Sequence, residues 1–190
     1  MKLTAHRVAA SPAALIVLAL LASAACVTTR VAGPEIAPPP FTAEQIRGAT
    51  DPGRTYVYRV HQGDGTSALR TLTFTRADEV SATLHAATTT PDGEALDEPT
   101  DEEVTWDQLV AHAAWPRAAT EISAARVAVL AGSFDAKLYT VREVDDDGAE
   151  VVTRAWFATA LPGAPVRFEQ VRSGVTLFTM ELVEHRPGAR

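Results

Sequence analysis

The chain has 190 residues, of which 46% are hydrophobic and 22% charged, and its formal net charge is −7. This composition is typical of one folded domain and excludes a disordered chain. The chain is acidic and has no cluster of cations, which excludes a typical nucleic-acid-binding protein. It has a single cysteine, which excludes an intrachain disulfide and a zinc-finger site.

The N-terminus has the order of a secretory signal peptide. A short basic segment with Lys2 and Arg7 precedes an unbroken apolar run over residues 13–22, and small residues follow up to Ala25. The run is shorter than the roughly 20 apolar residues that span a bilayer as a helix. We therefore expect residues 1–25 to be a removed targeting segment.

Cys26 comes directly after this segment, in the sequence Ser-Ala-Ala-Cys. This ending resembles the lipobox of bacterial lipoproteins, in which the cysteine thiol is acylated and the chain is cleaved just before it. The resemblance implies a protein anchored by Cys26 in the outer membrane, because Val27 stands where Asp would retain such a protein at the inner membrane. Cleavage after Ala24 stays open as an alternative, and it would give a secreted or periplasmic soluble protein.

Residues 26–40 are expected to form a tether after the lipidated cysteine. They contain no aromatic residue and end in three consecutive prolines, and proline-rich segments are extended. Every aromatic residue lies at Phe41 or later. We therefore expect one folded domain over residues 41–186 and a short tail over 187–190.

Most of this domain has the alternating β-branched and aromatic pattern of strands separated by turn residues. The sequence predicts a mainly β (α+β) fold, a strongly curved antiparallel sheet or half-open barrel with one or two short helices. An acidic segment over residues 91–104 is expected to be a solvated loop. The expected strands are 55–61, 68–75, 80–86, 126–130, 137–144, 151–158, 166–172 and 175–183.

Two capping boxes predict the helices. Thr105 and Gln108 begin one helix, which Pro116 ends, and a similar pair begins the other helix over residues 42–48. Helices this short are marginal alone. We therefore expect the first helix to pack Trp106 against the sheet, with the ring largely buried.

The last strands are apolar on both faces, which a sheet with one wet face would not show. Trp156, which we also expect to be largely buried, alternates with Phe157 and should point the opposite way. The second face needs a cover from a helix, a fold-over of the sheet, a ligand or a partner. The candidate residues for an apolar ligand site, or for a plain core face, are Trp156, Phe157, Phe178, Met180 and Leu182.

The C-terminal half has a further series of motifs. A small-Gly-x-Phe turn ends at Phe134, an aromatic pair stands at 156–157, and a Leu-Pro-Gly corner at 161–163 precedes Val166 and Arg167. This series, over residues 125–183, resembles uncharacterised bacterial envelope proteins with the curved half-barrel of the LolA/LolB lipoprotein carriers. The resemblance implies a carrier-like fold and brings no catalytic residue.

Motifs for catalysis or cofactors are weak. Residues 63–68 fit G-x-G-x-x-A, but a strand follows them, so they predict a hairpin turn. The adjacent acids at 145–147 lack the spacing of a calcium loop. We expect no catalytic residue, metal or cofactor, and the one enzymatic alternative left open is a hydrolase site assembled from distant residues.

Together these features predict a non-enzymatic lipoprotein of the cell envelope. Its lipid would hold it at the membrane, and its β domain would bind a lipid or another apolar ligand. The alternative is a structural or assembly subunit that docks on an envelope protein partner.

Overall fold

The structure is a computed structural model and describes residues 35–189. These residues belong to one compact unit over 34–190. The expected signal peptide, Cys26 and the first part of the tether lie outside the described residues, as does Arg190.

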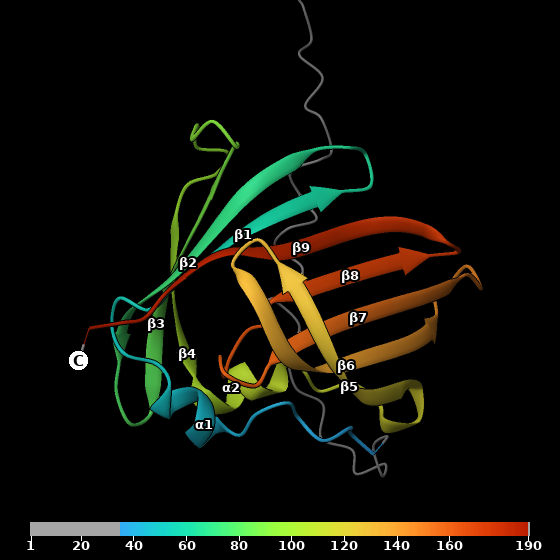
Figure 1. The fold of residues 1–190 in the computed structure, drawn as a ribbon, viewed down its shortest axis with the longest axis horizontal. Helices are drawn as coiled ribbons and strands as arrows, with labels where there is room; N and C mark the ends of the chain where they lie inside the picture. Colours follow the sequence, from blue (N-terminus) through green and yellow to red (C-terminus); the bar gives the residue numbers. More distant parts are fainter. Residues whose placement is uncertain (1–34, 190) are drawn as a thin grey trace, which may run out of the picture. The chain divides into compact units, whose positions relative to one another are not determined.

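The domain is built on one antiparallel sheet of nine strands, in the order β4-β3-β2-β1-β9-β8-β7-β6-β5 (Figure 1). The sheet curves but stays open, with β4 and β5 as its two edges. This confirms the predicted fold class. The strands are β1 Thr55–Gln62, β2 Ser67–Ala77, β3 Ser81–Thr89, β4 Thr100–Thr105, β5 Thr120–Val129, β6 Gly132–Val144, β7 Glu150–Ala158, β8 Arg167–Arg172 and β9 Val175–Arg186.

The strands β1 to β4 and β5 to β9 form two meanders, which meet where the first strand pairs with the last. In this pairing Tyr58 lies opposite Leu182, and Val60 lies opposite Met180. The core therefore combines side chains from both ends of the domain.

The acidic segment is not all loop, which corrects the expectation for residues 91–104. Its last part forms β4, which pairs with β3 at the sheet edge. An edge strand tolerates acidic side chains that face water, and here Val104 is buried while Ser81 donates to Glu103 across 2.8 Å. Strand β5 also begins six residues before its expected start at Arg126.

Both predicted helices are present, as α1 Ala43–Gly48 and α2 Trp106–Ala111, and each begins at its predicted capping box. Trp106 is buried as expected, and its indole N–H donates to the carbonyl of Asp78 across 3.1 Å. The helices lie at the bottom of Figure 1, between β4 and the strands β6 and β7. A short 3-10 turn, η2 Arg117–Ala119, leads into β5.

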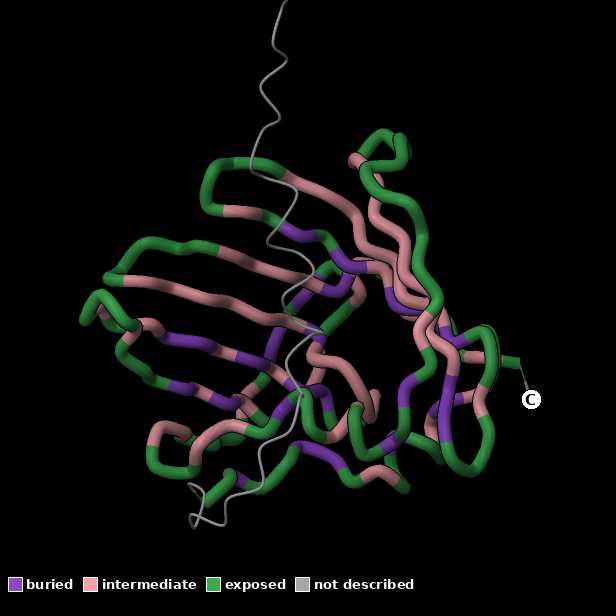
Figure 2. Tube along the Cα trace, turned by 180° about the vertical axis from the view of Figure 1, so that it is seen from behind, coloured by how far each residue is buried: buried purple, intermediate pink, exposed green. Residues whose placement is uncertain are grey.

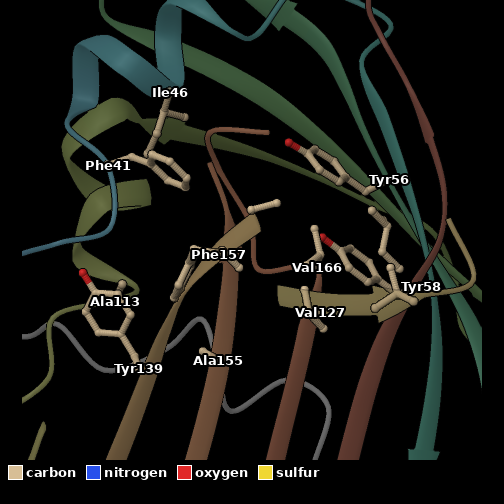
Figure 3. Packing of buried hydrophobic residues seen from close by; sticks show 14 of the residues in the cluster. Phe41, Ile46, Tyr56, Tyr58, Ala113, Val127, Tyr139, Ala155, Phe157 and Val166 are labelled. Atoms are coloured by element: carbon tan, nitrogen blue, oxygen red, sulfur yellow. The ribbon is translucent and has the colours of Figure 1, made fainter. Parts of the chain in front are cut away.

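The helices distinguish the two faces of the sheet. Phe41, just before α1, packs edge-on against Phe157 of β7, which packs against Tyr139 of β6 (Figure 3). We call this the helix-side face. Cross-strand pairing extends it from Tyr139 through Ala155, Phe168 and Met180 to Val60.

The last six residues of the expected tether, 35–40, pack on the domain and form what we call the N-terminal strap. The backbone N–H of Ala37 donates to the carbonyl of Trp115 across 2.9 Å. The hydroxyl of Tyr139 donates to the carbonyl of Pro38 across 2.8 Å. Packing in this domain therefore begins before the expected boundary at Phe41.

Burial is uneven along the strands. Figure 2 shows the buried residues gathered where the strands meet the helices, whereas the hairpin ends far from the helices are half-buried or exposed. Every residue of β8 is half-buried. The helix-side face is thus covered at one end of the strands and uncovered at the other.

Candidate functional site

The five candidate residues do not form one surface. Trp156 lies on the outer face, in register with Arg167, whose guanidinium stands 5.4 Å from the centre of the indole ring. The ring is half-buried, so the expectation of a largely buried Trp156 is wrong. Within residues 35–189 both α-helices pack on the other face, and here the side chain of Arg167 covers part of the Trp156 ring.

Phe157 and Leu182 belong to the closed core. Phe157 is 4% exposed and its ring centre lies 5.5 Å from that of Tyr139. Leu182 is fully buried, beside Val166, whose carbonyl accepts its N–H across 2.8 Å. Of the two alternatives, a ligand site or a core face, these two residues therefore belong to the core.

Phe178 and Met180 lie on the helix-side face, beyond the closed core. Both are half-buried. Phe178 packs edge-to-face on Phe168 with 5.9 Å between the ring centres, and Met180 lies between Phe168 and Val60 in the register of the sheet. We call Phe168, Phe178 and Met180 the apolar patch, and Val60 beside them is buried core.

Arg70 is a residue of this face that the sequence reading missed. It lies opposite Tyr58 on one side and Thr88 on the other. The guanidinium is half-buried, and this burial lowers the pKa of Arg70 while the charge of Asp97 raises it. The sequence could have indicated this position, because side chains alternate between the two faces of a strand and Arg70 stands two residues before the inward-pointing Leu72.

A second missed feature is the buried Arg54, which is 2% exposed. Its Nη1 donates to the hydroxyl of Thr50 across 3.0 Å and to the carbonyl of Pro162 across 2.9 Å. The guanidinium also lies over the ring of Tyr56, 4.9 Å from its centre. Arg54 thus ties the end of α1 to the Leu-Pro-Gly corner before β8.

Two tyrosine hydroxyls are buried beside this arginine. The rings of Tyr56 and Tyr58 are stacked with 6.0 Å between their centres, and neither hydroxyl has a hydrogen-bond partner among the described residues. Burial raises the pKa of Tyr56 to about 12 and that of Tyr58 well above the usual range. Both hydroxyls are therefore neutral and unsuited to act as acids or bases near neutral pH.

Two open hollows lie away from the apolar patch. One, of about 600 Å³, follows the β5–β6 hairpin from Ile122 to Lys137, and the other, of about 280 Å³, lies between Arg47 and Trp106. Within residues 35–189 no group of three or more His, Cys, Asp or Glu side chains gathers to hold a metal ion. No helix in the same range has the length and apolar character needed to cross a membrane.

Comparison with models of known protein families gives no match, and comparison with curated protein sequences gives none either. The functional proposal therefore rests on the geometry of the domain. Its main support is that the helix-side face is covered by the helices at one end of the strands and uncovered at the other.

Proposed function

We propose that this chain is a non-enzymatic lipoprotein of the bacterial envelope, whose β domain binds a lipid or another apolar ligand on the helix-side face. The apolar patch carries the proposal. Phe168, Phe178 and Met180 stay half-buried on the same face that is closed by the helices further along the strands.

The energetic reason is the apolar surface that the patch leaves in contact with water. Covering such surface gains about 25 cal/mol per Å². Isolated apolar side chains on a surface need no explanation, whereas contiguous apolar surface marks a candidate site of interaction. Phe168, Phe178 and Met180 come from the neighbouring strands β8 and β9 and so form one continuous area.

Anchoring is the second part of the proposal. An acyl chain on Cys26 would attach the protein to the outer membrane, and more than one chain makes attachment durable. The strap holds the chain at residue 35, which leaves residues 27–34 between the lipid and the domain. Eight residues reach about 29 Å at most. A ligand would therefore be received close to the membrane.

Metabolic labelling with an alkyne fatty acid tests the anchor. We expect label on the wild-type protein and none on Cys26→Ser. An intact mass that begins at Ala25, or equal labelling of the variant, would exclude the acylated form and favour the secreted alternative.

Native mass spectrometry of purified residues 27–190 tests the ligand site. We expect a copurified lipid, together with saturable binding of a fluorescent fatty acid. Phe178→Ser should weaken that binding, whereas Leu177→Ser should leave it unchanged, because Leu177 is the exposed neighbour that alternates to the opposite face of β9. An empty protein without saturable binding would overturn the ligand role, and a crosslinked envelope protein would then support the assembly alternative.

A further inference from the structure

We infer that the ligand is an anionic amphiphile, a long-chain fatty acid, whose carboxylate is bound by Arg70 while its chain covers the apolar patch. This inference rests on the proposed function and names the class of ligand for the same face. It depends on where Arg70 lies, on the partners it has, and on its distance from the patch.

The register places Arg70 on the helix-side face. Its cross-strand neighbour Tyr58 is a core residue of that face, and its own strand alternates so that Leu72 lies on the same side. Arg59, on the neighbouring strand β1, alternates to the outer face and is exposed. Two arginines on adjacent strands thus face opposite sides of one sheet.

The half-buried guanidinium of Arg70 would be stabilised by a negatively charged partner. A guanidinium that is partly withdrawn from water gains from a counter-charge, and it forms two parallel hydrogen bonds with a carboxylate. Among residues 35–189, no side chain forms an ion pair or a hydrogen bond with Arg70. The described carboxylate whose charge acts on it is Asp97, in the exposed segment between β3 and β4. A ligand carboxylate would supply the direct partner.

The spacing of the strands fits one molecule bound at both places. Arg70 lies on β2 and Phe168 on β8, and these strands are separated by β1 and β9. Neighbouring strands lie about 4.8 Å apart, so three steps across the sheet cover roughly 14 Å. Arg70 pairs with Tyr58, two residues along β1 from Val60, so a chain that runs from Arg70 crosses the sheet diagonally past Met180 to the rings of Phe168 and Phe178. A long acyl chain can extend that far.

Calorimetric titration with palmitate and with its uncharged methyl ester tests the inference on residues 27–190. We expect the wild-type protein to bind palmitate more tightly than the ester. Arg70→Gln should weaken palmitate binding about 10- to 100-fold, the loss typical of one charge-assisted pair, and should leave the ester nearly unchanged. Arg59→Gln is the matched control and should change neither.

Each outcome decides between the two proposals. If palmitate and the ester bind the wild-type protein equally, or if Arg70→Gln weakens both alike, the role of Arg70 is overturned while the proposed apolar site stands. If neither probe binds, both proposals fail. If Arg70→Gln does not fold, equal binding of palmitate and the ester by the wild-type protein still overturns the inference, because that comparison needs no variant.

Discussion

The Nε atom of Arg54 donates to Nε2 of His185 across 3.3 Å and thereby joins the start of β1 to the end of β9. Arg54 is a permanent donor, so His185 must accept with a neutral ring. Burial and the charge of Arg54 both lower the pKa of His185 below its usual value of 6.5. This contact, beside the pairing of β1 with β9 where the two meanders meet, is therefore sensitive to acid.

The first prediction concerns this sensitivity. Because the folded state holds His185 neutral, the unfolded state binds its proton more readily, and stability rises with pH. The contribution is complete above about pH 6.5 and is lost as the pH falls from there to the lowered pKa of the folded protein. Urea unfolding at a series of pH values measures this loss.

The control for that series is His185→Gln, whose side chain can still accept from Arg54 but does not titrate. We expect the free energy of unfolding of this variant to vary less between about pH 8 and about pH 5 than that of the wild type. Identical slopes for the two proteins would show that His185 is not held neutral.

The second prediction concerns the buried hydroxyl of Tyr58. Removing an unpartnered polar group from a core is neutral or stabilising, so Tyr58→Phe should not lower the free energy of unfolding. Tyr58→Ala removes the ring as well and should cost about 3–5 kcal/mol. Chemical denaturation of both variants checks this pair, and a clear loss in Tyr58→Phe would reveal a partner for the hydroxyl.

The third prediction concerns the N-terminal strap. Tyr139→Phe removes the hydrogen bond to the carbonyl of Pro38 and leaves the ring in the core. We expect a loss of about 0.5–1.5 kcal/mol in the free energy of unfolding, as for one hydrogen bond. Faster proteolytic cleavage within residues 35–40 should accompany it. An unchanged cleavage rate would mean that this bond does not hold the strap.

The fourth prediction compares how much two tryptophans, Trp106 and Trp156, contribute to stability. Trp106, the first residue of α2, is 5% exposed, whereas Trp156 is half-buried on the outer face beside Arg167. Trp106→Ala should cost about 3–5 kcal/mol, and Trp156→Ala should cost clearly less. Thermal unfolding of the two variants gives the order, and the reverse order would contradict the assignment of the two faces.

Local signals predicted much of this fold because they lie within a few residues of the structure they specify. The capping boxes at Thr42 and Thr105 correctly place the starts of both helices. The alternation of Phe178, Met180 and Leu182 is likewise local, and the register places all three on one face of β9.

Features that depend on distant partners were not predicted. Strand β4 is acidic and becomes a strand by pairing with β3, where His85 bonds to Asp101 across 2.9 Å. The sequence predicts a tether at the strap, but Tyr139, which donates to its Pro38 carbonyl, lies about a hundred residues further along the chain. Arg54 was not singled out, because its partners come from three separate segments of the chain.

Met180 offers the most direct test of ligand binding on the helix-side face. The chain contains two methionines, Met1 and Met180, so Met180 is the one native methionine of residues 27–190. With ¹³C-methyl-methionine labelling, its signal should shift in a saturable way when palmitate is added and should keep its position with butyrate, whose chain is too short to reach the patch. Saturable palmitate binding without a shift of the Met180 signal would contradict the proposed site.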